Sequence, residues 1–372
     1  MDKKRFANQV NSYLHLIALY LNKKTAVDFK VDEETLSFFA LLSKNHSLMA
    51  LLYKAILDTR LEIPQDKLKK LEEYYLSTIR KDVLFEKERK TLFEFLNENQ
   101  IDYLPLKGLV VKHFYLDPYT REYADNDILF SAHEDKIKEF FIKHGYKVES
   151  YKKGNHDVYL KKPFYNFEMH RALFAESVHN KEFVKYFDNY LNKAPIKEGY
   201  EHYLSNEDFY IYFTAHTHKH FDVSGCGIRT LVDYYQYLKN STLDFDYINK
   251  ELDKIGLLEF SNKISSLSLK IFDEQELNEE EKEMLLYIAS SGTYGTLEHS
   301  VTKGVNEKGR FGYFMARVFP PYSFYKTAYP WAYKSVILIP IAWLARLFRI
   351  LFKNPKKAKN ELKMISKTKK EK

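Results

Sequence analysis

Two aspartates separated by one residue, Asp125 and Asp127, are the part of the sequence best suited to chemistry. They lie in an apolar stretch, residues 123–130, whose pattern predicts a β-strand. Because side chains alternate across a strand, both carboxylates project from one face and repel each other unless a cation lies between them. Such oxygen ligands suit Mg²⁺, which commonly takes one or two carboxylates and keeps its other positions for water and phosphate. The pair therefore predicts half of a metal site for phosphoryl chemistry.

A lysine and a glycine, Lys107 and Gly108, precede the aspartates and predict an anion-binding turn. Residues 103–106 form a short apolar run, and residues 109–115 predict a helix. Glycine lets backbone N–H groups approach an anion, the helix N-terminus adds its dipole, and lysine supplies a mobile positive charge. A Lys-Gly pair alone is weak evidence, but ahead of an Asp-x-Asp strand it predicts a phosphate site.

A later stretch supplies a third carboxylate, Glu168. Residues 166–171 predict a strand on which Glu168 and His170 share one face. Glu168 can then join the two aspartates around one or two metal ions. Asp157 is a weaker alternative, because it adjoins a predicted Gly-Asn turn.

Together these features resemble the uncharacterised nucleotidyltransferase family of the DNA polymerase β-like nucleotidyltransferase superfamily. In that family a Leu-Lys-Gly turn, a helix, an Arg-x-x-x-Asp-x-Asp run and a later acid-x-His strand follow in this order, as residues 106–127 and 168–170 do here. The resemblance covers most of the chain. Asn126 departs from the family, which usually has an apolar residue there. Because Asn126 faces away from the predicted metal, the carboxylate geometry stays intact.

The resemblance implies an α+β fold with a polymerase-β-like nucleotidyltransferase core, a small mixed sheet with helices, between two helical regions. Within that core, Ser131 is expected to cap the helix that follows the aspartate strand, with Glu134 returning the hydrogen bond. The predicted parts are an N-terminal helical region (1–98), the core (99–175), a C-terminal helical region (176–310), an aromatic and amphipathic segment (311–352) and a lysine-rich tail (353–372).

The implied reaction transfers a nucleoside monophosphate from an NTP, ATP above all, to an unknown acceptor hydroxyl or phosphate and releases pyrophosphate. Mg²⁺, or Mn²⁺ in its place, is the implied cofactor. The residues implied as both catalytic and metal-binding are Asp125, Asp127 and Glu168.

Nucleotide binding is implied for the Lys-Gly turn and for several residues after it. The turn would cradle the β- and γ-phosphates, and Arg121 would neutralise the triphosphate or fix the aspartate-bearing strand. The full implied set is Lys107, Gly108, Arg121, His170, His216 and Arg229. Arg229 also lies four residues before Asp233 on a predicted helix, where the two are expected to pair on the surface.

Four histidines need separate interpretation. Neutral imidazole rarely binds Mg²⁺, so His156 and His170 are expected to be structural or to orient phosphate or carboxylate groups. His216 and His220 share a helix face at the spacing of a zinc-binding helix. The glutamate that follows the first histidine in such helices is absent, and no third ligand is evident. A structural or phosphate-contacting role is therefore better supported than zinc.

Composition favours a folded, helix-rich protein with aromatic cores, because 12 glycines and 10 prolines accompany 30 tyrosines and 28 phenylalanines. The single cysteine, Cys226, excludes an intramolecular disulfide. No clean apolar run follows the first residues, so no secretory signal is expected and the cytoplasm is the expected location.

The net charge of +7 belongs to the end of the chain. Residues 353–372 contain nine lysines and two glutamates, and the rest of the chain is balanced. A body without surplus positive charge does not predict general nucleic-acid binding. The surplus is instead a feature of the tail.

An apolar stretch, residues 335–352, precedes this tail. It is near the lower length for a membrane span, and its proline and two arginines count against spanning. Arg346, Arg349 and Lys353 are expected to form a basic stripe opposite a leucine- and phenylalanine-rich face. With the tail, residues 335–372 favour peripheral binding to an anionic membrane at its inner face; the alternative is a helix that packs on the body.

Two other functions share the predicted core. A toxin-like nucleotidyltransferase that modifies tRNA or protein would add a basic patch near the cleft. A catalytically silent scaffold would keep the fold but break the acid set. Three acids and the Leu-Lys-Gly turn are all in place, which favours an active enzyme.

Overall fold

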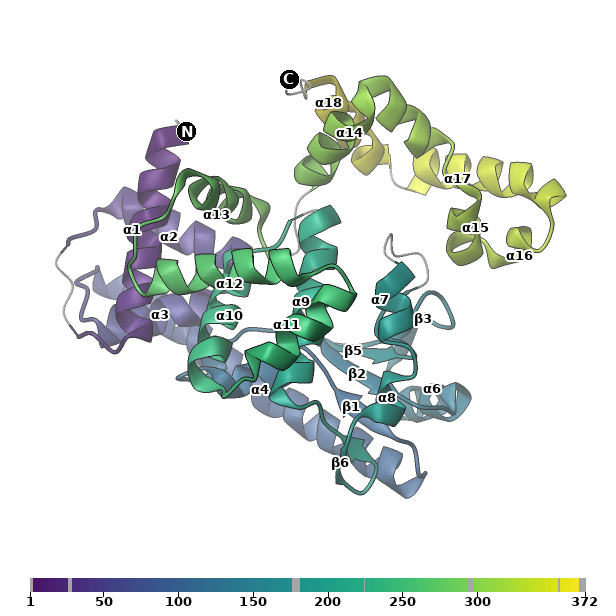
Figure 1. The fold of residues 1–372 in the computed structure, drawn as a ribbon, viewed down its shortest axis with the longest axis horizontal. Coiled ribbons are helices and arrows are strands. Elements are labelled where there is room, and N and C mark those ends of the chain that lie inside the picture. Colours follow the sequence, from purple (N-terminus) through teal and green to yellow (C-terminus); the bar gives the residue numbers. More distant parts are fainter. Residues whose placement is uncertain are drawn as a thin grey trace.

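A computed structural model describes residues 3–25, 29–175, 181–223, 225–293, 297–353 and 355–367 (Figure 1). The helices are α1 (Lys3–Leu21), α2 (Glu33–His46), α3 (Met49–Asp58), α4 (Gln65–Glu98), α5 (Gly108–Val111), α6 (Glu134–Lys143), α7 (Lys181–Tyr186), α8 (Tyr190–Lys193), α9 (Asn206–Val223), α10 (Ile228–Asn240), α11 (Phe245–Lys254), α12 (Leu258–Phe272), α13 (Glu279–Ser291), α14 (Leu297–Val318), α15 (Tyr322–Ala328), α16 (Pro330–Tyr333), α17 (Ile339–Lys353) and α18 (Pro355–Lys367). Three 3₁₀ helices are η1 (Lys112–Phe114), η2 (Pro118–Thr120) and η3 (Val336–Leu338). The strands are β1 (Tyr103–Pro105), β2 (Asn126–Phe130), β3 (Lys147–Ser150), β4 (His156–Lys161), β5 (Tyr165–His170), β6 (Ile196–Glu198) and β7 (Glu201–His202).

A mixed seven-stranded sheet forms the centre of the fold, in the order β3-β4-β5-β2-β1-β7-β6. Strand β2 occupies the middle position, pairing antiparallel with β1 and parallel with β5. Strands β4 and β5 pair antiparallel, which brings His156 opposite His170. The α+β class with a mixed sheet is therefore confirmed.

One face of the sheet is covered by α4 and α6 (Figure 1). Both helices bury an apolar stripe there, with Phe85, Leu92 and Leu96 on α4 and Ile137, Phe140 and Phe141 on α6. These spacings of three, four and seven residues place the side chains on one side of each helix. The long helix α4 thus packs against one face of the strands that carry the acids.

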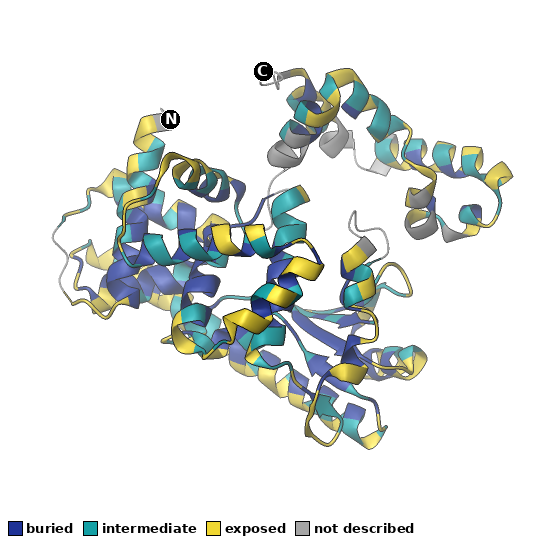
Figure 2. Ribbon diagram, viewed as in Figure 1, coloured by how far each residue is buried: buried dark blue, intermediate teal, exposed yellow. Residues whose placement is uncertain are grey.

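The opposite face lies beneath the larger helical body. Leu104 of β1 and Leu129 of β2 belong to the same buried cluster as residues of α1, α3, α9, α10 and α12. Figure 2 shows this body as mostly buried around its centre, with exposed residues on its outer helices. The sheet is therefore held between α4 and α6 on one side and the helical body on the other.

Several predicted elements have different boundaries. Strand β2 begins at Asn126, so Asp125 lies just before it. The predicted capping box at Ser131 is wrong, because α6 begins at Glu134 after His133 in a left-handed conformation and has no side-chain cap. The backbone N–H of Ser131 instead donates to Asp102 O, which holds this residue at the end of the sheet. The predicted helix over 109–115 is divided between α5 and η1.

Two strands occur where only helices were predicted. Strands β6 and β7 extend the sheet on the far side of β1, and Glu201 of β7 pairs in parallel with Tyr103. They are two or three residues long, and β6 is exposed throughout. Strands this short carry no recognisable alternation, so their sequence does not reveal them.

The last helices form a separate group, which we call the C-terminal lobe (residues 297–367), at the upper right of Figure 1. Helix α14 packs along α18, and Trp343 of α17 donates its indole N–H to Val318 O at 2.9 Å. The prediction that Arg346 belongs to an exposed basic stripe is wrong. Its side chain is buried and donates to Val318 O and Arg317 O. Among the helices that the structure describes, none combines the length and apolar character that crossing a bilayer requires.

The packing of α4 predicts a clear difference between two substitutions on that helix. Phe85 is fully buried against the rings of Tyr123, Tyr165 and Phe167, whereas Leu76 is 51% exposed. Phe85→Ala should reduce the free energy of unfolding by about 3–5 kcal/mol, because it leaves a cavity. Leu76→Ala should change it by less than about 0.5 kcal/mol. Denaturant unfolding of both variants tests this, and equal changes in the free energy of unfolding would contradict the packing of α4 against the sheet.

Candidate active site

The register of β2 on β5 brings two of the predicted acids together. The parallel pairing places Asp127 opposite Glu168, and alternation directs both side chains to the same face. This face is the one opposite α4 and α6, since Ile128, Phe167 and Met169 point into the cluster on that side. The proximity of Asp127 and Glu168 thus follows from strand pairing, whereas the convergence of Asp125 with them stays a prediction.

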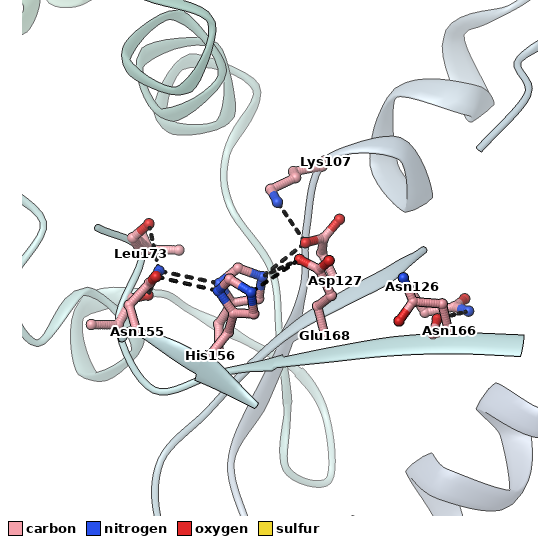
Figure 3. Close-up of polar contacts among 10 residues, drawn as sticks. Lys107, Asn126, Asp127, Asn155, His156, Asn166, Glu168 and Leu173 are labelled. Atoms are coloured by element: carbon pink, nitrogen blue, oxygen red, sulfur yellow. Dashed lines mark hydrogen bonds and ion pairs between the residues drawn. The ribbon is translucent and has the colours of Figure 1, made fainter. Parts of the chain in front are cut away.

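Asp127 is at the centre of the polar contacts on this face (Figure 3). Its Oδ1 accepts from Lys107 Nζ at 2.5 Å and from His170 Nε2 at 2.8 Å. Burial alone would raise the pKa of Asp127, but Lys107 and His170 outweigh that effect and hold the pKa well below its usual range. Asp127 is therefore an ionised carboxylate inside the protein.

The other two acids are in the opposite situation. Burial, followed by the charge of Asp127, raises the pKa of Asp125 above its ordinary value. The same two causes raise the pKa of Glu168 to about 7. One anion, Asp127, thus disfavours ionisation of its two neighbours. A divalent cation would relieve this repulsion, so the set fits a divalent metal ion.

The Lys-Gly turn has a different physical basis from the one predicted. Lys107, not Gly108, has the positive φ, at 50°. A Cβ atom on Gly108 would lie 3.1 Å from Nη1 of Arg121. The glycine is therefore needed where the Arg121 side chain approaches the start of α5.

Arg121 forms a buried fork with Asp233 of α10. Its Nε and Nη2 donate to the two carboxylate oxygens of Asp233, each at 2.9 Å. The predicted surface pair between Arg229 and Asp233 is wrong, because Asp233 is buried and Arg229 donates to Glu122 O at 3.0 Å. Both arginines thus tie α10 to residues 121–122, just ahead of Asp125. This placement supports the strand-fixing role implied for Arg121.

Two of the predicted histidines, His156 and His170, lie beside Glu168. His156 Nε2 is 3.7 Å and His170 Nε2 is 3.8 Å from Glu168 Oε2. Within the described part of the chain, these three residues are the group whose possible metal-ligand atoms lie within 4.8 Å of one another. Asp157 faces the other way, pairs with Arg171 at 2.5 Å and does not join the site.

Helix α9 covers the site with a polar stripe. Burial lowers the pKa of His216 well below its ordinary value and that of His220 to about 4, so both are neutral. Their rings contact each other, with centroids 4.6 Å apart. Neither belongs to the metal-ligand group found among the described residues. The preference for a structural or phosphate-contacting role over zinc binding stays a prediction.

Three residues of the site were not predicted: Tyr212 and Lys219 on α9, and Asn155 before β4. Burial, then Lys107, lowers the pKa of Lys219, while Glu168 and Asp127 oppose the change, so this lysine shares the electrostatics of the acids. Tyr212, His216, Lys219 and His220 recur at the spacing of one helix face, and that pattern was visible in the sequence. No sequence signal marked Asn155.

The comparison with known families agrees with this structure. A mixed sheet flanked by helices is consistent with the α+β fold of nucleotidyltransferases. The family described as uncharacterised nucleotidyltransferase matches residues 32–273, well over half of the chain and all of the site, so the protein belongs to that family. No curated protein and no solved structure matches the chain. The C-terminal lobe lies outside the matched residues.

The raised pKa of Glu168 predicts how the stability of the metal-free protein changes with pH. Its ordinary pKa is 4.5, so between about pH 4.5 and 7 the folded protein keeps a proton that the unfolded chain loses. Stability should therefore fall as pH rises through this window, by up to about 3 kcal/mol from this group. Glu168→Gln should flatten the fall. Thermal unfolding in EDTA from pH 5 to 8 measures it, with the exposed Glu259→Gln as control. Parallel curves for wild type and Glu168→Gln would contradict the assignment.

Proposed function

We propose that the protein transfers a nucleoside monophosphate from an NTP, ATP in the first instance, to a hydroxyl or phosphate of an acceptor. The observation that carries this proposal is the pairing of Asp127 with Glu168 on one sheet face, beside the cation of the Lys107 turn. Membership of the nucleotidyltransferase family supports the same reaction class. The acceptor oxygen bonds to the α-phosphorus, the bond from that phosphorus to the bridging oxygen breaks, and pyrophosphate leaves.

The metal in this proposal is Mg²⁺, with Mn²⁺ able to replace it. Asp125, Asp127 and Glu168 supply the carboxylate oxygens that would hold it, and the repulsion among them supports a cation at this position. When bound, the metal neutralises triphosphate charge and polarises the reacting phosphate. Lys107 meanwhile neutralises Asp127 from the other side.

The basic residues of the site have two different roles: some hold the loop in place, and others can contact the triphosphate. Arg121 and Arg229 are committed to Asp233 and to Glu122 O, so they hold the loop ahead of Asp125 in place. Lys107 and Lys219 approach the acids from the turn and from α9. We assign the triphosphate to these two lysines, with Gly108 at the start of α5 and His216 beside Lys219.

Glu168 either completes the metal site or, where the two aspartates alone hold the metal, takes the acceptor proton. A carboxyl group with a pKa of about 7 has the affinity that a general base needs near neutral pH. It is partly exposed, whereas Asp127 is buried, so an acceptor can reach it. His170 donates to Asp127, and this hydrogen bond does not occupy the carboxyl group of Glu168.

Asp125→Asn is the sharpest test of the proposed reaction. Asp127→Asn would leave the half-buried Lys107 without its partner, and a loss of activity could then reflect a damaged fold. Asp125 is only partly buried and is repelled by Asp127, so its amide variant should be as stable as wild type or more so. Mg²⁺-dependent release of pyrophosphate from ATP should fall by about 100- to 1,000-fold.

The matched control is Asp135→Asn, on the exposed start of α6. It should retain full activity. Each variant is incubated with labelled NTPs and a cell extract as the source of acceptor, and melting temperatures are recorded alongside. Full activity of Asp125→Asn at an unchanged melting temperature would refute the proposed metal site.

We also propose that the C-terminal lobe binds an anionic membrane surface. Helix α17 leaves Ile341, Leu344, Phe348 and Phe352 between 56% and 68% exposed, at the spacing of one helix face. Its opposite side packs within the lobe through Trp343. The lysine-rich tail follows this helix directly, and each basic residue near an anionic leaflet contributes about 1 kcal/mol. The acceptor would then be met at the membrane.

Vesicle sedimentation tests this surface without truncating the chain. The double variant Leu344→Ser, Phe348→Ser should lose most binding to vesicles that contain phosphatidylserine, because both exposed side chains belong to the proposed contact face. The same change at Leu76, on α4, is the control and should bind like wild type. High salt should weaken binding, because exposed charges are screened. Equal binding of all three proteins would exclude α17 as the contact.

A further inference from the structure

Asn155 fixes the orientation of two histidines at the edge of the site. Its side-chain amide nitrogen faces the carbonyl oxygens of Ala172 at 2.9 Å and Leu173 at 3.5 Å. Carbonyl oxygens only accept hydrogen bonds, so the nitrogen must be on that side. The amide oxygen Oδ1 of Asn155 therefore faces His156 Nδ1, at 3.3 Å (Figure 3).

This orientation determines which nitrogen of His156 carries the proton. An amide oxygen only accepts, so Nδ1 of His156 must donate to it. A neutral imidazole has one N–H, and the lone pair is then on Nε2. The bare Nε2 points at the carboxylate of Glu168, with 3.7 Å to Oε2.

His170 has the opposite arrangement. Its Nδ1 lies 3.5 Å from the amide nitrogen of Asn155 and accepts from it. Its Nε2 therefore carries the proton and donates it to Asp127. Of the three residues whose ligand atoms lie close together, His170 is thus already used in positioning Asp127. The bare Nε2 of His156 and the carboxyl group of Glu168 remain, and they face each other.

A bare imidazole nitrogen that faces a carboxyl group is satisfied by a cation between them, either a proton or a metal ion that replaces it. We propose that His156 Nε2 and Glu168 bind one divalent metal through nitrogen and oxygen, so that this position prefers Mn²⁺ to Mg²⁺. Imidazole suits transition metals, whereas Mg²⁺ strongly favours oxygen ligands. His156 is about one third exposed and Glu168 one fifth, so an ion can reach both. Asn155 is the residue that orients the His156 ring, in the way outer partners commonly orient ligating histidines.

This inference rests on the proposed function for its biological setting, but metal binding can be measured without turnover. Electron spin echo spectroscopy of Mn²⁺ bound to the full-length protein, without nucleotide, reports a directly bonded histidine nitrogen. Wild type should show this ¹⁴N modulation. His156→Gln should lose it and weaken Mn²⁺ binding by about tenfold or more, while Mg²⁺ binding changes less.

His170→Gln is the matched control, because it removes the other histidine of the same group. It should keep the ¹⁴N modulation. Bound Mn²⁺ without nitrogen modulation in wild type would overturn the inference and leave an all-oxygen site, with the proposed reaction intact. Modulation that depends on His170 instead of His156 would also overturn it. Absence of any Mn²⁺ or Mg²⁺ binding, even with ATP, would refute the metal site of the proposed function as well.

Discussion

An ionised carboxylate buried in the middle of a sheet is the constraint on which the rest of the site depends. Asp127 stays charged because Lys107 and His170 both donate to the same oxygen. A buried charge without partners is very unfavourable, so the turn before α5 and the end of β5 must both be correctly placed. The fold of the core is in this sense built around one anion. Its field then sets the protonation of Asp125 and Glu168.

The positioning of that anion extends well beyond the core. Residues 121–122 are linked to α10 by Arg121 and Arg229, whose partners are 112 and 107 residues away along the chain. The side chain of Asp82 on α4 accepts from Lys112, just after α5. Helices from both sides of the sheet thus hold the loops that carry Lys107 and Asp125. The helical regions are therefore structural supports of the chemistry.

The sequence predicted those parts of the site that follow from local periodicity. A period of two places Asp127, Glu168 and His170 on common strand faces, and the structure agrees. The Arg121–Asp233 fork was not predictable, because it depends on the packing of α10 against a distant loop. The surface pair expected for Asp233 followed local helix spacing, which tertiary burial overrode. Arg346 was misplaced for the same reason, since periodicity does not show which side of a helix finds a partner.

The close approach of Arg121 to Gly108 changes what the Leu-Lys-Gly signature reports. The missing Cβ accommodates a side chain of the protein itself, which is held there by Asp233. A descendant that lost its acids would still need this glycine, as long as the fork held its loop to α10. The glycine of this turn is therefore required by the packing of the fold, whereas the carboxylates bear directly on the proposed chemistry. The turn alone therefore does not distinguish an active transferase from a protein that keeps only the fold.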